Sequence, residues 1–337
     1  MASCQDGSCV VVPLTQEQRR QQYESDPANI PQACQDILDS IINISQGFHY
    51  GIRVISAIEE STWNIWDEII HLAKIIPSES AEHDRLISVI LRTRQCGALT
   101  RKSSATSGSP EETDEKAITS DGQSLWADLP GLAQELHDSW VKESQPLDSE
   151  GRERLATFTA KLCGVGVLPE KLSYCALWLF KEALEKDQPQ TSLAELLPAI
   201  RAWTKQAKHV LVKLAVASHD FKSVTALDYD PDSLLPGDLC QKEGILEAGF
   251  NLRRWLFWRK RLGDIYQSGD EAASQIARDC FEEMVAAGSA VALRIPGEER
   301  FLRKAWDALD EVLLKNGSGN CVQLSEIAMD PAWAYED

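Results

Sequence analysis

Apolar residues recur at helical spacing through most of this chain. The clearest case is residues 63–76, where they fall at intervals of three and four and so line one face of a helix. The members of this stripe are Trp63, Trp66, Ile69, Ile70, Leu72, Ala73 and Ile76. Pro77 ends the predicted helix, and residues 83–96 repeat the pattern after a short polar connection. The two segments therefore predict an antiparallel helical hairpin.

The same periodicity predicts about ten helices and almost no sheet. Helices are expected over residues 15–25, 31–44, 52–60, 63–76, 83–96, 152–163, 170–186, 193–218, 251–267, 270–288 and 297–315. Thr15 suits the N-cap of the first of these helices, and Ser61 and Thr62 suit the cap of the fourth. Only residues 291–295 have strand-like composition. The predicted fold class is all-α: an irregular orthogonal bundle of about ten helices with one disordered insertion.

Residues 97–124 interrupt the helical pattern. They are rich in Ser, Thr, Gly and charged residues and have almost no apolar side chains. Such a segment buries too little surface to offset the entropy lost on ordering, so we predict a disordered insertion. We place it within a single α-helical domain of residues 15–320, with a domain boundary at the insertion as the alternative. Residues 1–14 are expected to be a flexible N-terminus, and residues 321–337 a C-terminal tail.

The chain is strongly acidic, with 52 acidic and 34 basic residues and a formal net charge of −18. A field of this sign repels polyanions, whereas binding to nucleic acid or to an anionic membrane needs concentrated Lys and Arg. The N-terminal segment has no signal-peptide pattern, and no apolar run reaches the length of a membrane span. We therefore expect neither nucleic acid nor a membrane as a partner.

Nine cysteines are scattered along the chain without a compact framework. Several of them lie among apolar helix residues, where cysteine acts as a small buried hydrophobe. This usage is typical of reduced thiols. The expected compartment is the cytoplasm, with the nucleus as the alternative.

Glu68 and His71 are three residues apart, so they share one face of the predicted helix. Carboxylate-bridged di-metal bundles use this spacing, but they need a second Glu-x-x-His copy and two further glutamates. The chain has no second copy. We therefore expect no metal site and interpret the pair as a polar helix face. If the protein has a small-molecule pocket, Glu68 and His71 are candidate polar contacts in it.

Residues 251–267 combine aromatic and basic side chains. Trp255, Trp258, Leu262 and Ile265 follow a helical stripe that predicts a buried seam. The basic residues Arg253, Arg254, Arg259, Lys260 and Arg261 then lie on its flanks. Arg beside Trp suits an anionic ligand or nucleic-acid bases, but the interpretation that we favour is a core helix whose guanidiniums pair with the protein's own carboxylates. Arg254, Trp255 and Trp258 are nevertheless candidate pocket residues.

Motifs that signal known chemistries are missing from the sequence. It has no nucleophile elbow, phosphate-binding loop, complete dinucleotide fingerprint or zinc-ligand spacing. The acidic turn at residues 228–233 lacks the Gly and Glu of a calcium loop. We therefore expect no cofactor and assign no catalytic residue.

Several blocks of the sequence, in the same order, resemble a fungal family defined as domain of unknown function 3632. The resemblance covers residues 63–266. Its blocks are 63–73 (WNIWDEIIHLA), 125–130 (LWADLP), 155–162 (LATFTAKL), 174–178 (YCALW), 198–203 (PAIRAW) and 254–261 (RWLFWRKR). The resemblance implies a filamentous-fungal source, a helical fold and cytosolic residence. Some members look like neighbours of specialised-metabolite genes, but the family has no defined activity from which site residues could be transferred.

Two functions are consistent with these observations, and the sequence leaves open whether the protein is an enzyme. The one we favour is a non-catalytic interaction or regulatory protein that binds a protein partner. The alternative is a small-molecule enzyme or ligand binder, accessory to fungal specialised-metabolite biosynthesis and acting on a small hydrophobic metabolite. The alternative predicts a cavity of at least about 300 Å3 that contains a titratable group with a displaced pKa.

Overall fold

The computed structural model describes residues 3–5, 8–10, 15–102, 114–142, 146–188, 191–222, 230–268, 271–316, 327 and 329–335. It divides the chain into two compact units, residues 1–135 and 136–337, which are treated separately below. Helices make up most of each unit, and the only paired strands among the described residues form two short two-stranded sheets. The all-α class is therefore confirmed. Within the described ranges, no helix is long and apolar enough to cross a membrane.

The first unit consists mainly of four helices. In chain order its elements are β1 (Ser3–Gln5), β2 (Ser8–Val10), α1 (Gln16–Ser25), the 3-10 helix η1 (Pro27–Asn29), α2 (Ile30–His49), α3 (Ile55–Ile75), α4 (Ala81–Gln95), β3 (Thr100–Lys102) and β4 (Asp114–Lys116). Thr15 caps α1 as predicted, since its side chain accepts from the Gln18 backbone N–H and the Gln18 side chain accepts from the Thr15 backbone N–H.

The core of the first unit lies where α2 packs against α3 and α4. Trp66 on α3 is fully buried, and its Nε1 donates to the Pro130 carbonyl oxygen at 2.8 Å. Trp126 packs edge-on against Trp66, with ring centroids 6.4 Å apart, and its Nε1 donates to Ser45 Oγ on α2 at 2.9 Å. The two indoles therefore tie residues 125–130 to the helices while keeping both buried N–H groups bonded.

Helix α3 differs from the sequence prediction, which placed separate helices at residues 52–60 and 63–76. The structure has one continuous helix. Ser61 and Thr62 do not cap its second part. Instead, their hydroxyls donate to the carbonyl oxygens of Ala57 and Ile58, both at 2.8 Å, and so remain compatible with the helix interior.

The predicted disordered insertion, residues 97–124, is corrected at both of its ends. β3 pairs antiparallel with β4, and Arg101 Nε donates to Glu115 Oε2 at 2.8 Å across the pair. Ala117 is 1% exposed, and its N–H donates to the Leu99 carbonyl oxygen at 2.8 Å. A cross-strand ion pair and one buried alanine leave little trace in composition, which explains the difference. Residues 103–113 lie outside the described residues.

The second unit contains most of the helices in the described part of the chain. In chain order these are the end of α5 (Leu132–Val141), α6 (Ser149–Gly164), α7 (Pro169–Phe180), the π-helical turn η2 (Lys181–Glu185), α8 (Leu193–Val216), α9 (Pro231–Leu234), α10 (Asp238–Lys242), α11 (Leu252–Ser268), α12 (Glu271–Val285), the 3-10 helix η3 (Ser289–Val291), α13 (Glu298–Asn316) and the 3-10 helix η5 (Pro331–Ala334). The strand-like stretch 291–295 forms no strand: η3 ends at Val291, Ala292 lies in a turn, and residues 293–295 have no regular secondary structure.

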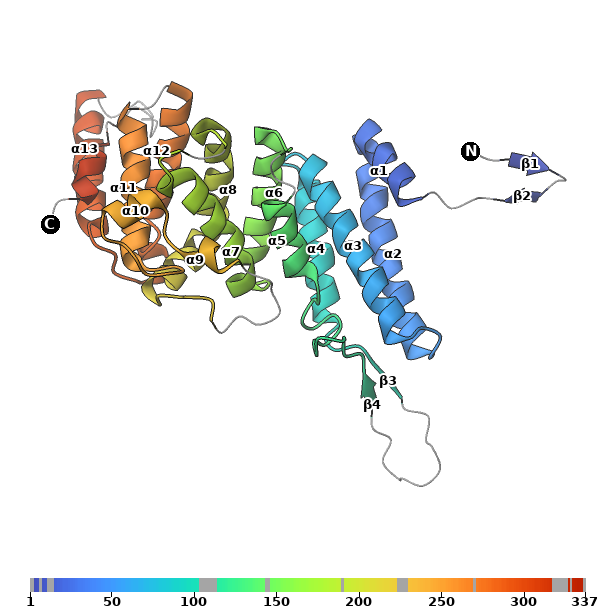
Figure 1. Cartoon of the computed structure of the whole chain (residues 1–337). Helices are drawn as coiled ribbons and strands as arrows, with labels where there is room; N and C mark the ends of the chain where they lie inside the picture. Colours follow the sequence, from blue (N-terminus) through green and yellow to red (C-terminus); the bar gives the residue numbers. More distant parts are fainter. Residues whose placement is uncertain are drawn as a thin grey trace. The chain divides into compact units, whose positions relative to one another are not determined.

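Helix α8 is central to the second unit, since it packs against α6, α7, α11 and α12. α11, orange in Figure 1, lies beside α12 and also contacts η2 and η5. Gly164 allows the close approach of α6 to α8, because a Cβ there would overlap the Gln206 carbonyl oxygen. The contacts of α10 and α11 with η2, and of α11 with η5, thus bring together segments that are far apart in the sequence.

The two ends of the chain contain more structure than the sequence predicted. Within residues 1–14, expected to be flexible, β1 pairs antiparallel with β2. Within the predicted tail, residues 321–337, η5 packs against α11 and α13. Gly263 on α11 makes room for this segment, since a Cβ there would overlap Tyr335 Oη and come within 2.8 Å of Pro331 Cβ in η5.

Candidate functional site

Glu68 lines a small polar cavity in the first unit. The cavity, about 270 Å3 in volume, is bordered by Arg19, Ser40, Asn43, Ile44, Arg53, Ser61, Asn64, Ile65 and Glu68. Tyr23 donates its hydroxyl to Glu68 Oε1 at 3.4 Å, and Arg19 Nη2 lies 4.0 Å from Glu68 Oε2. Burial is the main cause of a raised Glu68 pKa, with Arg19 acting in the opposite direction. Burial also raises the pKa of Tyr23 to about 12.

His71, one turn further along α3, has a different partner. Its Nε2 lies 3.3 Å from Glu24 Oε1, and it is not among the residues that line the cavity. The shared helix face predicted for Glu68 and His71 is therefore present, but the two side chains do not converge on one site. No group of three His, Cys, Asp or Glu side chains among the described residues is placed to hold a metal ion.

Replacing His71 with glutamine should reduce the loss of stability on the acidic side of neutrality. Burial, followed by the charge of Arg20, lowers the pKa of His71 from 6.5, although Glu24 opposes this. Since the native state resists protonation, His71 contributes stability above pH 6.5 that is lost as the pH falls through the lower folded-state pKa. Urea unfolding at pH values from about 7 to 5 measures this effect. The free energy of unfolding of His71→Gln should fall less steeply with decreasing pH than that of the unchanged protein, by at most about 1.4 kcal/mol per pH unit. Glu68 is present in both proteins, so its contribution to the pH dependence cancels in the comparison. If the free energy of unfolding changed equally with pH in the two proteins, this role of His71 would be refuted.

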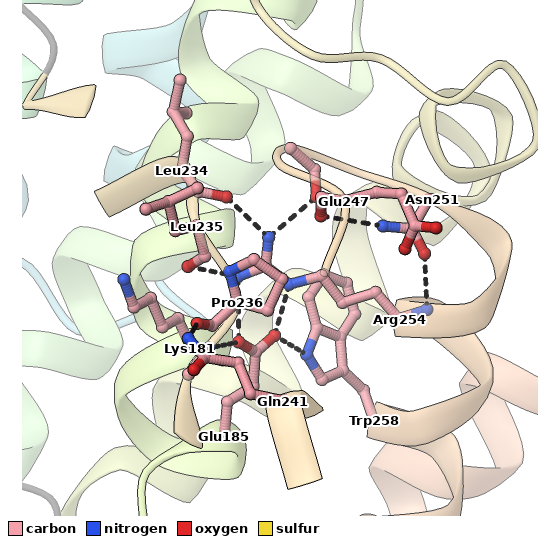
Figure 2. Close-up of polar contacts among 12 residues, drawn as sticks. Lys181, Glu185, Leu234, Leu235, Pro236, Gln241, Glu247, Asn251, Arg254 and Trp258 are labelled. Atoms are coloured by element: carbon pink, nitrogen blue, oxygen red, sulfur yellow. Dashed lines mark hydrogen bonds and ion pairs between the residues drawn. The ribbon is translucent and has the colours of Figure 1, made fainter. Parts of the chain in front are cut away.

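In the second unit, Arg254 and Trp258 converge on one buried carboxylate, that of Glu185 (Figure 2). The Arg254 and Glu185 side chains are both 0% exposed. Glu185 Oε1 accepts from Arg254 Nε at 2.5 Å and from Trp258 Nε1 at 2.6 Å. Glu185 Oε2 accepts from Arg254 Nη2 at 2.9 Å and from the Gly237 N–H at 2.7 Å. Four donors thus compensate the buried negative charge.

The remaining hydrogen bonds of Arg254 reach the loops before α11. Its Nη1 donates to the Leu234 carbonyl oxygen at 3.0 Å, as Figure 2 shows. The same Nη1 donates to the Gly249 carbonyl oxygen at 2.8 Å. Asn251 Oδ1 accepts from the Arg254 backbone N–H at 2.8 Å and so caps the start of α11. The Glu185–Arg254 pair, which we call the buried ion pair, therefore fixes η2, the 234–251 loops and α11 to one another.

Trp255 is fully buried in the seam of α11, with Trp258 and Leu262. The predicted seam is therefore confirmed. For Arg254, the interpretation that its guanidinium pairs with one of the protein's own carboxylates is confirmed as well. None of Arg254, Trp255 and Trp258 is among the lining residues of the groove described next.

That groove, about 520 Å3 in volume, follows the opposite face of α11, and we call it the α11 groove. The residues that α11 contributes at i, i+3, i+4, i+7, i+8 and i+11 are Arg253, Leu256, Phe257, Lys260, Arg261 and Asp264. Arg259 also lines it. The other lining residues are Leu239, Lys242, Glu243, Ile245, Pro296, Ala334 and Tyr335. The groove thus combines apolar side chains with five cationic and two acidic ones.

Arg259 connects the groove to the C-terminal segment. Its Nη2 donates to the carbonyl oxygens of Pro296 at 2.8 Å and Ala334 at 3.0 Å. Burial lowers the pKa of Arg259 to about 10, although Tyr335 and Glu298 act in the opposite direction. The guanidinium therefore remains charged at neutral pH while holding two walls of the groove in place.

Comparison with known proteins places this chain in a family. The family model described as "Protein of unknown function (DUF3632)" matches residues 66–262, more than half of the chain. The chain belongs to the DUF3632 family. It is also 30% identical over 252 residues to "Oxopyrrolidines biosynthesis cluster protein G" of Penicillium oxalicum, which covers 68% of this chain and 67% of that protein. No solved structure matches the chain.

In this DUF3632 protein, the matched region covers only part of the α11 groove. It includes the buried ion pair and the groove residues of α11 up to Arg261. Asp264, Pro296, Ala334 and Tyr335 lie beyond it. Leu239, Lys242, Glu243 and Ile245 lie inside the family match, so only the wall formed by Pro296, Ala334 and Tyr335 comes from outside it.

Sequence reasoning missed Leu256 and Phe257 as groove residues. It concentrated on the tryptophan stripe and on Arg254, which the structure places inside the unit. The missed signal is a second stripe, with Arg253, Lys260 and Arg261, that follows the same helical intervals on the opposite face. An amphipathic basic face is visible in the sequence, but the residues across the groove from it are not.

Proposed function

We propose that this protein is a non-catalytic accessory protein of fungal specialised-metabolite biosynthesis that holds a small molecule in the α11 groove. The observation that carries the proposal is the groove itself. Its volume of about 520 Å3 lies within the range of small-molecule sites, and it mixes apolar and cationic side chains in a chain of net charge −18. The relative named for an oxopyrrolidines biosynthesis cluster supports the biosynthetic setting.

The chemistry of the groove favours binding over catalysis. Glu185 lies in the buried ion pair rather than in the groove, and its oxygens already accept four hydrogen bonds. Burial raises the pKa of Tyr335, so this hydroxyl keeps its proton near neutrality and is a poor general base. The carboxylates of its described lining, Glu243 and Asp264, are the first candidates for a general base if the groove were catalytic.

We place this function in the cytoplasm. The six cysteines whose state the structure describes are free: Cys34, Cys96, Cys163, Cys175, Cys240 and Cys280. Burial raises the pKa of Cys34 to about 11 and that of Cys280 to about 12, so these thiols are unreactive hydrophobic side chains. This usage suits a reducing compartment.

Native mass spectrometry of the protein purified from its own organism tests the proposal. We expect a mass excess from a bound metabolite, and Phe257→Ala should lose it because Phe257 lines the groove. As a control, Leu314→Ala changes an apolar residue of α13 that is 84% exposed and should retain the ligand. A bare monomer would refute the binding function, and a stoichiometric protein complex without a small molecule would favour a protein partner instead.

Incubation of the released ligand with fresh protein separates binding from catalysis. The proposal expects the ligand to be recovered unchanged. Conversion to a new compound would show an enzyme, and its loss in Glu243→Gln or Asp264→Asn would then identify the acid or base.

A further inference from the structure

The cations of the α11 groove differ in how they are neutralised. At its edge, Lys242 lies 3.6 Å from Asp187, and Arg253 lies 3.8 Å from Glu247. Lys260 and Arg261 have no ion pair with any carboxylate in the described part of the chain. An acidic protein has an excess of carboxylates, so cations left without one beside a groove indicate a site for an external anion.

Arg259 adds buried positive charge to the same place. It is 2% exposed, yet its hydrogen bonds go to two carbonyl oxygens and not to a carboxylate. Its Nε and Nη1 are buried and have no hydrogen-bond acceptor among the described residues. A charge held at low dielectric acts strongly on a nearby ion, so an anion in the groove would be stabilised by Arg259 even without touching it.

The rest of the lining narrows the class of anion. Leu256 and Phe257 are half-buried and present apolar surface between the cationic positions of α11. Glu243 and Asp264 line the same groove and would repel a ligand that carries several negative charges. A single carboxylate attached to an apolar body can pair with the cations and pack on the apolar side chains. A polyphosphate or a nucleic acid lacks the apolar body and would be repelled by the two acidic side chains.

We propose that the α11 groove binds an amphipathic carboxylic acid, whose carboxylate is held by Arg261 and Lys260 and whose apolar body packs on Leu256 and Phe257. This inference rests on the proposed binding function and specifies its ligand class. Guanidinium and carboxylate are matched in geometry, which makes Arg261 the stronger contact of the two cations.

A pair of fluorescent probes that differ in one charge tests the ligand class. The probes are 11-(dansylamino)undecanoic acid and its methyl ester, titrated into the full-length protein. The acid should bind at least about tenfold more tightly than the ester, because a hydrogen bond to an ion is worth about a factor of ten or more. Its affinity should also weaken with added salt, since Lys260 is exposed at the rim of the groove.

Variants assign the two halves of the ligand to their residues. Arg261→Gln should weaken the acid about tenfold and leave the ester unchanged, and Phe257→Ala should weaken both probes. Arg303→Gln is the matched control, since it removes one exposed arginine of α13 outside the groove lining and should change neither affinity.

Two results would overturn the inference. Equal binding of acid and ester, with both weakened by Phe257→Ala, would refute the carboxylate while leaving the groove as a binding site. Acid binding that Arg261→Gln does not weaken would refute Arg261 as its contact. A failure of the binding function itself is detected separately, by native mass spectrometry of the protein from its own organism.

Discussion

Glu185→Gln should lower the free energy of unfolding by about 3–5 kcal/mol, because it leaves the Arg254 guanidinium buried without its counter-charge. The glutamine also turns an NH2 group toward donors on Arg254, Trp258 and Gly237. Urea unfolding followed by circular dichroism measures the loss. A change below about 1 kcal/mol would show that the buried ion pair does not hold this part of the unit together.

Two further variants separate the pair from general damage. Arg303→Met breaks the Arg303–Glu299 pair, whose side chains are 70% and 91% exposed, and should cost less than about 0.5 kcal/mol. The double variant Glu185→Leu, Arg254→Met removes both buried charges and should be less destabilised than the sum of its single variants. Additive effects would contradict a direct interaction between the two side chains.

Trp66→Ala should lower the free energy of unfolding by about 3–5 kcal/mol, since it removes a fully buried indole from the core of the first unit. The loss includes the packing against Trp126 and leaves the Pro130 carbonyl oxygen without its donor. Trp63→Ala, one turn earlier on α3, is the matched control. Trp63 is 40% exposed, so its truncation should cost at most about 2 kcal/mol. Similar losses for both variants would mean that Trp66 has no special place in the core.

The same two variants, Trp66→Ala and Glu185→Gln, test the prediction of a single α-helical domain over residues 15–320. They lie in different compact units of the chain. A single domain should unfold in one cooperative transition that either variant shifts as a whole. Two transitions, with each variant shifting a different one, would contradict the prediction and place a domain boundary between the units.

The buried seam of α11 could be predicted from the local spacing of its apolar residues. Trp255, Trp258 and Leu262 are spaced so that any helix buries them together, and the structure confirms it. The partner of Arg254 could not be identified in this way. Glu185 is 69 residues earlier in the chain and comes from a π-helical turn that the pattern did not distinguish from ordinary helix. No local spacing connects the two residues, so the sequence predicted an internal carboxylate partner without naming it.

The insertion at residues 97–124 shows where a prediction from composition fails. Its composition predicts disorder over residues 97–124, and that property averages over the whole segment. The order at its ends depends on Arg101 meeting Glu115 and on the burial of Ala117. These contacts involve a few residues, and composition is insensitive to them.

The sequence by itself determined the all-α class, most helix positions, the inner face of α11 and membership of the DUF3632 family, because each depends on residues close together in the chain or on their order. Only the tertiary structure decided which basic residues of α11 are neutralised inside the unit and which face a groove. Helical periodicity tells which residues share a face, but not what that face meets. The groove on which the proposed function depends is formed where α11 meets residues 239–245, which precede it closely, and Ala334 and Tyr335, which come from a distant part of the chain.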